Sequence, residues 1–90
     1  MKVVINRCYG GFSIPDRYLE RLGLKYRHDE IERTNPELVA IVEENGGIIE
    51  EWYSCLKIAE VPDDATDYEI NDYDGYESIT YVVDGKLHHI

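Results

Sequence analysis

The dipeptide Asp84-Gly85 is the feature that most constrains the fold, because it lies between two runs of strand-forming residues. An Asp-Gly pair tolerates positive φ at both positions, as the centre of a type I′ hairpin turn requires. The pair therefore predicts a hairpin in which Val82 lies opposite Leu87 and Tyr81 lies opposite His88. Asp74-Gly75 predicts a further turn, between strands over 67–72 and 76–83.

Strand-forming runs also occur at the beginning and in the middle of the chain. Lys2 to Tyr9 contains consecutive β-branched residues and is followed by Gly10-Gly11, which predicts a break. Leu56 to Val61 is a second such run, and it stops at Pro62-Asp63-Asp64. These runs predict one strand near the N-terminus and a C-terminal part made mainly of strands.

Two short helices are predicted between the first strand and the later ones. For the first helix, Ser13 is the expected N-cap, Pro15 and Asp16 suit the first turn, and Gly23 marks the end. Residues 24–33 are charged and weakly patterned, so we expect a loop or a short extended segment there.

The second helix is predicted to begin at Asn35-Pro36-Glu37 and to end at Asn45-Gly46-Gly47. No clear pattern assigns residues 47–55. The element order β-α-α-β-β-β-β predicts an α+β fold, with two short helices packed on one face of a mainly antiparallel sheet. The helix is expected to face that sheet with its apolar residues Leu38, Val39, Ile41 and Val42.

The length of 90 residues predicts a single domain, residues 1–90, because so short a chain cannot bury two separate cores. The hydrophobic fraction of 43% is enough for a modest core. No apolar run approaches the roughly 20 residues needed to cross a bilayer, and residues 1–7 lack the apolar core of a signal peptide. We therefore expect a cytoplasmic protein without a membrane partner.

Charge is distributed unevenly along the chain. Residues 1–33 carry seven Lys or Arg and five Asp or Glu, whereas residues 34–90 carry only Lys57 and Lys86 against fourteen acids. The overall charge of −10 therefore combines +2 in the first part with −12 in the second. This asymmetry predicts a mildly basic end and a strongly acidic face. Such a face would repel nucleic acid and attract a basic protein surface.

Residues 7–13 pass from a strand through two glycines toward a predicted helix start, where backbone N–H groups can approach a phosphate. The pattern predicts a site for a phosphate-bearing ligand such as a nucleotide second messenger. Its candidate residues are Arg7, Tyr9, Gly10, Gly11, Ser13, Arg17 and Arg21. Neither GxxxxGK[ST] nor GxGxxG is present, so the alternative is a tight turn that simply needs glycine.

The acidic segment 67–77 is rich in tyrosine, which offers rigid contact area with a polar tip. It predicts a protein-binding face formed by Tyr68, Asp72, Tyr73, Asp74, Tyr76 and Glu77. The alternative is a half-buried strand with a solvated outer row. Calcium binding is a weak third alternative, because an EF-hand alignment of Asp72 and Asp74 fails: it places Ile70 at the first position of the loop and Tyr81 at the last.

Residues that commonly carry catalysis or bind metals show no suitable spacing. Cys8 and Cys55 form no CxxC pair, and we expect free thiols. The histidines lie at 28, 88 and 89, where they form no ligand set with each other or with the cysteines. We therefore predict neither a catalytic residue nor a metal or cofactor site, and a small enzyme is the least favoured functional class.

Four segments carry a resemblance to a known group of proteins. The opening Lys2-Val3-Val4-Ile5-Asn6-Arg7-Cys8-Tyr9-Gly10-Gly11-Phe12-Ser13, the segment 33–39 and the stretches 61–64 and 73–75 resemble small uncharacterised proteins of phage and prophage genomes. That group has no established activity, so the resemblance assigns no site residue. It implies a viral accessory protein in the cytoplasm of an infected bacterium. Because such proteins often antagonise bacterial defence, a role of this kind is expected by association.

Two non-catalytic mechanisms follow from these patterns. In the first, the acidic part of the chain occupies the basic surface of a host protein and inhibits it. In the second, the Gly10-Gly11 loop sequesters a nucleotide signal. A homo-oligomer would serve either mechanism, because symmetry can complete a pocket or enlarge a face. The charge asymmetry favours the first.

Overall fold

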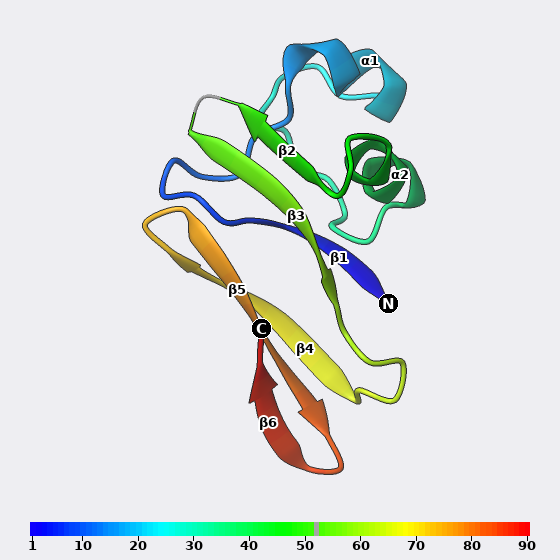
Figure 1. Ribbon diagram of the computed structural model, residues 1–90, viewed down its shortest axis with the longest axis vertical. Helices are drawn as coiled ribbons and strands as arrows, with labels where there is room; N and C mark the ends of the chain where they lie inside the picture. Colours follow the sequence, from blue (N-terminus) through cyan, green and yellow to red (C-terminus); the bar gives the residue numbers. More distant parts are fainter. Residues whose placement is uncertain (52) are drawn as a thin grey trace.

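The computed structural model describes residues 1–51 and 53–90. Figure 1 shows the helices on one side of an antiparallel sheet, with a second antiparallel sheet on its other side. The α+β class predicted from the sequence is confirmed, including the packing of the helices on a sheet face. Over the described residues, the strands divide between two three-stranded sheets.

The first sheet has the strand order β1-β3-β2. β1 is Lys2–Asn6, β2 is Ile48–Glu51 and β3 is Ser54–Glu60. β1 pairs with β3 so that Val4 lies opposite Ile58, and β2 pairs with the other edge of β3. β2 therefore lies in the stretch that the sequence pattern left unassigned.

The second sheet is a meander of the order β4-β5-β6. β4 is Asp67–Tyr73, β5 is Tyr76–Val83 and β6 is Lys86–His89. The predicted hairpin register is confirmed, with Val82 opposite Leu87 and Tyr81 opposite His88. Asp84 and Gly85 have φ of 52° and 74°, as a turn with two left-handed residues requires.

The first helical segment is shorter than predicted and starts later. It consists of a 3₁₀ turn, Asp16–Tyr18, followed by α1, Leu19–Leu22, and it ends at the left-handed Gly23. The prediction that Ser13 caps this helix is wrong. Ser13 lies before the first turn, and its hydroxyl is 2.6 Å from that of Ser54 on β3.

The second helix, α2, spans Pro36–Glu44 and closely matches its predicted bounds. Asn35 caps it through Oδ1, which accepts hydrogen bonds from the backbone N–H groups of Glu37 (2.9 Å) and Leu38 (3.3 Å). The predicted apolar face is confirmed, because all four of its residues are buried: Leu38, Val39, Ile41 and Val42.

The core has two parts, one on each side of the first sheet. Alternation along β1 places Val4 toward the helices and Val3 and Ile5 toward the second sheet. The helix-side cluster joins α2 to the first sheet and consists of Val4, Ile14, Leu38, Val39, Ile41, Val42, Ile49 and Leu56. The cluster between the sheets consists of Val3, Ile5, Ala59, Val61 and Ile79. The first sheet is therefore packed on both faces.

β1 ends at Asn6, three residues earlier than predicted, because the Asn6 side chain takes over local backbone hydrogen bonding. Its Oδ1 accepts from the N–H of Cys8 (3.4 Å) and of Cys55 (2.8 Å). Its Nδ2 donates to the carbonyls of Cys8 (2.7 Å) and Gly75 (2.6 Å). An asparagine that bonds to the backbone two residues ahead turns the chain. Asn6 thus joins the end of β1 to β3 and to the β4–β5 turn.

Replacing Asn35 with alanine is expected to lower the free energy of unfolding by about 1 kcal/mol, because two N–H groups at the start of α2 lose their acceptor. Urea denaturation of the two proteins measures the difference. Asn35→Asp keeps a side-chain oxygen at the cap and should stay close to the original stability. Equal losses in the two variants would contradict a capping role.

Candidate functional site

Arg7, from the predicted phosphate site, is held against the second sheet. Its Nη1 donates to the Tyr76 hydroxyl (3.2 Å) and to the backbone carbonyl of Glu77 (3.1 Å). The guanidinium carbon also lies 5.3 Å from the centre of the Tyr76 ring. Arg7 therefore links the end of β1 to β5.

Arg17 and Arg21 lie on the helical side and pair with carboxylates. Arg17 forms an ion pair of 2.8 Å with Glu51 of β2. Arg21 pairs with Glu37 and Glu44 of α2. These hydrogen bonds, the one to Glu44 more than the one to Glu37, raise the pKa of Arg21 above its ordinary value. The three arginines of the predicted site thus contact different elements, and the structure does not gather them around Gly10-Gly11.

Close packing requires glycine at position 10, and a left-handed backbone favours glycine at position 11. A Cβ on Gly10 would lie 1.8 Å from the Cβ of Tyr53, so any larger residue would collide with the β2–β3 turn. Gly11 has φ of 93°, and its carbonyl accepts a hydrogen bond of 2.8 Å from the Ser54 hydroxyl. These contacts support the alternative reading of the glycines, a turn built for its packing.

Three turns meet where the glycines pack, and together they form what we call the turn junction: residues 9–11, residue 53 and residues 72–76. A Cβ on Gly75 would lie 2.4 Å from the Gly11 nitrogen and 2.6 Å from the Tyr9 carbonyl oxygen. The β4–β5 turn therefore contacts the 9–11 loop directly, backbone against backbone. In Figure 1 the 9–11 loop and the β4–β5 turn lie side by side on the left.

Tyrosines cover the surface of the turn junction. Tyr9, Tyr53 and Tyr73 are 68%, 72% and 73% exposed. The rings of Tyr9 and Tyr76 are 5.4 Å apart, and Tyr76 lies opposite Tyr73 in the β4–β5 register. The fold thus brings Tyr9, from the predicted ligand loop, onto one surface with Tyr73 and Tyr76, from the predicted protein-binding face.

Acidic side chains flank these tyrosines. Asp72 and Asp74 are exposed, and the Asp72 carboxylate accepts a hydrogen bond of 2.8 Å from the Gly75 N–H. Asp74 has φ of 52° in its Asp-Gly turn. Four of the six residues predicted for a protein-binding face therefore lie in the junction: Asp72, Tyr73, Asp74 and Tyr76.

The prediction that Glu77 belongs to the exposed face is wrong. Glu77 is 3% exposed and forms a two-point ion pair with Arg33, with distances of 2.5 Å and 2.9 Å. Its Oε1 also accepts from the backbone N–H of Asn6 (2.8 Å). Arg33 in turn lies 3.5 Å from the centre of the Phe12 ring. Alternation along β5 turns Glu77 inward with Ile79, which is also buried.

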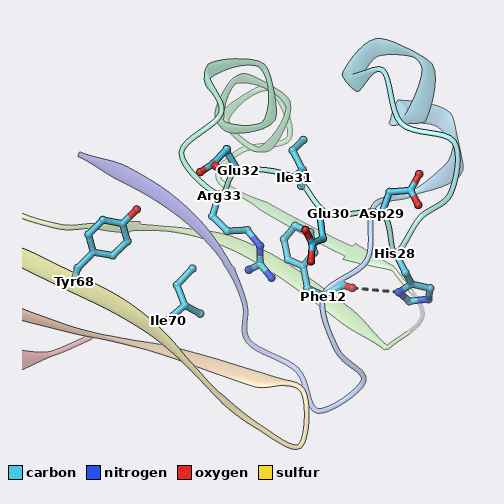
Figure 2. Close-up of a pocket in the computed structure, with 9 residues that line it drawn as sticks. All are labelled: Phe12, His28, Asp29, Glu30, Ile31, Glu32, Arg33, Tyr68 and Ile70. Atoms are coloured by element: carbon cyan, nitrogen blue, oxygen red, sulfur yellow. Dashed lines mark hydrogen bonds between the residues drawn. The ribbon is translucent and has the colours of Figure 1, made fainter.

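Tyr68 is the remaining residue of the predicted face, and it lines a different surface. A cleft of about 570 Å³ lies between the segment 28–33 and β4 (Figure 2). Tyr68 and Ile70 point into it from β4, and Arg33 and Phe12 lie on the opposite wall. The complete lining is Phe12, His28, Asp29, Glu30, Ile31, Glu32, Arg33, Tyr68 and Ile70.

The sequence pattern did not indicate this cleft, because residues 28–33 show no periodicity. Their positions are fixed by tertiary contacts, such as the hydrogen bond of 2.8 Å from the Val4 N–H to the Arg33 carbonyl. A partial signal existed in β5, where the two-residue period places Glu77 on the same face as the apolar Ile79. An inward-facing glutamate requires a cation, and Arg33 provides it.

The two cysteines are free thiols, Cys8 half-buried and Cys55 buried. The pKa of the Cys55 thiol is raised above its ordinary value, mainly by burial and in addition by a hydrogen bond to Cys8. Such a thiol stays protonated and unreactive at neutral pH. Among the described residues, no group of three His, Cys, Asp or Glu side chains is arranged to hold a metal ion.

Comparison of the chain with protein-family models, with curated proteins and with solved structures finds no match. Within the part of the chain that the structure describes, no helix has the length and apolar character needed to cross a membrane.

Proposed function

We propose that the protein acts without catalysis, by binding a partner protein that presents a basic surface, and that the turn junction is its main contact. The observation that carries this proposal is the set of three highly exposed tyrosines on tightly packed turns. Tyrosine is enriched in protein interfaces, where it provides large contact area and a polar tip. On the resemblance to phage proteins, the partner would belong to a bacterial defence system that this binding inhibits.

Rigidity supports a binding role for the junction. The 9–11 loop is confined by Tyr53 on one side and by Gly75 on the other. The backbone that carries the tyrosines is therefore held before binding, and the loops lose less conformational entropy when a partner docks. Asp72 and Asp74 add negative charge at the same place, which favours a basic partner and speeds association.

The nucleotide-binding alternative receives less support from the structure. It requires several cations that converge on one ligand. Arg17 and Arg21 instead pair with carboxylates of β2 and α2, and one side of Gly10 packs against Tyr53.

Affinity capture from a bacterial lysate, followed by titration of the purified partner, tests the proposal. The double variant Tyr9→Ala/Tyr73→Ala should weaken binding by about thirty-fold or more, as loss of an aromatic hot spot does. Tyr26→Ala is the matched control, because Tyr26 is 61% exposed but lies outside the junction. Its affinity should stay unchanged.

A charge experiment adds a second readout. Asp72→Asn/Asp74→Asn should weaken binding and reduce its salt dependence, because two junction charges are removed. Asp64→Asn/Asp84→Asn removes the same charge from exposed positions elsewhere, and Asp84 has the same φ of 52° in an Asp-Gly turn. Equal effects of the two pairs would contradict a junction contact. Native mass spectrometry that finds a nucleotide retained by the protein, and lost in Arg7→Ala, would favour the nucleotide-binding alternative.

A further inference from the structure

We infer that the cleft between residues 28–33 and β4 accepts an extended basic segment of a partner protein, which adds as a further strand to the free edge of β4. This inference concerns a second surface, and it rests on the proposed function only in taking the partner to be a basic protein. The edge of β4 reaches the turn junction at Asp72 and Tyr73, but the lining of the cleft shares no residue with the junction. Variants in the cleft lining can therefore be tested separately from variants at Tyr9 or Tyr53.

The first observation is the unpaired edge of β4. In the second sheet, β4 pairs with β5 along one edge, and over residues 1–51 and 53–90 no segment pairs with its other edge. This edge is seven residues long. The edge of β1 differs, because Arg33 covers it by accepting a hydrogen bond from Val4. An open edge of this length offers N–H and C=O groups to an added strand.

The second observation is the position of the cleft beside that edge. Tyr68 and Ile70 point from β4 into the cleft (Figure 2). Side chains on the same face of neighbouring strands lie next to each other. Alternate side chains of an added strand would therefore enter the cleft beside Tyr68 and Ile70, where they would also meet the ring of Phe12.

Charge decides which kind of segment fits. Arg33 is neutralised by Glu77, so the remaining charged groups of the lining include three carboxylates: Asp29, Glu30 and Glu32. The Asp29 carboxylate accepts from the N–H groups of Lys25 and Tyr26, whereas Glu30 and Glu32 are exposed. A lysine or arginine in the added strand would lie near these two glutamates, and apolar side chains would contact Tyr68 and Ile70.

The acids of β4 argue against a second copy of the chain as the occupant. Asp67, Glu69 and Asp72 are exposed along this strand. Edge-to-edge pairing of two β4 strands would bring like charges together, and charged edges are a known device against self-association. The same charges favour a strand that carries lysine or arginine.

A synthetic peptide tests this inference directly. The probe is acetyl-Val-Thr-Lys-Thr-Ile-Lys-Arg-amide with a fluorescent label, titrated against the intact protein. In a strand, its Val, first Lys, Ile and Arg lie on one face, so apolar and basic side chains enter the cleft together. Binding is expected, with slowed amide hydrogen exchange in β4. A peptide with glutamate at the three basic positions should not bind. A peptide N-methylated at alternate residues keeps its charge but cannot pair as a strand, and it should bind at least about tenfold more weakly.

Protein variants locate the site. Glu30→Gln/Glu32→Gln should weaken binding of the basic peptide about fivefold at low salt, as loss of two partly exposed charge contacts does. Glu20→Gln/Glu50→Gln removes two exposed glutamates outside the cleft and should leave the affinity unchanged. Tyr9→Ala/Tyr53→Ala should also leave it unchanged, which separates this site from the turn junction.

The inference is overturned by any of three results: no binding of the basic peptide at millimolar concentration, equal binding of the N-methylated peptide, or equal losses in the two glutamate pairs. If the basic peptide binds as expected but the junction variants do not affect capture of a partner, the proposal for the cleft stands and the proposal for the turn junction is rejected.

Discussion

Glu77→Ala is expected to lower the free energy of unfolding by about 3–5 kcal/mol, because Arg33 would keep its charge in a partly buried position without a partner. The Arg33 side chain is only 22% exposed in the ion pair. The backbone N–H of Asn6 would lose its acceptor as well. Urea denaturation measures the loss, and a domain of this size can be largely unfolded by it.

The exposed ion pair Arg17–Glu51 supplies the control. Glu51→Ala should cost about 1 kcal/mol or less, because water replaces most of what a surface pair contributes. The double variant Arg33→Met/Glu77→Leu removes both charges and should recover part of the stability lost in Glu77→Ala. Equal costs for Glu77→Ala and Glu51→Ala would show that the buried pair adds no more than a surface pair.

Gly75→Ala is expected to lower the free energy of unfolding by about 2–5 kcal/mol, the sum of a left-handed alanine and of overpacking. The new methyl group would lie 2.4 Å and 2.6 Å from backbone atoms of Gly11 and Tyr9, which cannot rotate away as a flexible side chain can. The turn junction would have to open for the variant to fold.

Gly85→Ala separates these two contributions. Gly85 has φ of 74° in an equivalent Asp-Gly turn, but a Cβ there meets no atom within 4 Å. Gly85→Ala should therefore lower the free energy of unfolding only by the cost of a left-handed alanine, about 1–2 kcal/mol. If the two alanine variants are equally stable, the contact between the β4–β5 turn and the 9–11 loop is looser than described.

Local sequence signals predicted the elements whose conformation is set by neighbouring residues. Asp84-Gly85 placed the β5–β6 register correctly, because an Asp-Gly turn permits few geometries. Asn35 and Pro36 located the start of α2, because a capping residue followed by proline is typical of the first turn of a helix. By contrast, β2 was missed because its residues Ile48–Glu51 are too few for a clear period.

The candidate sites depended on contacts between distant parts of the chain, and sequence patterns could not supply these. Tyr9 and Tyr73 were assigned to separate hypotheses, yet the packing of Gly75 on Gly11 brings them onto one surface. Charge counting placed Glu77 among exposed acids, although Arg33, far from it in sequence, neutralises it inside the protein. Net charge describes a segment as a whole, and it does not say which side chains are paired.

The strand order has a consequence for the sequence of events in folding. β4, β5 and β6 follow one another through tight turns, so the second sheet can form from local contacts. β1 must wait for β3, because Lys2 pairs with Glu60 and the intervening chain has to close first. During synthesis, Val3, Val4 and Ile5 therefore leave the ribosome long before their partners. Closure of the first sheet is thus expected to limit the rate at which the protein folds.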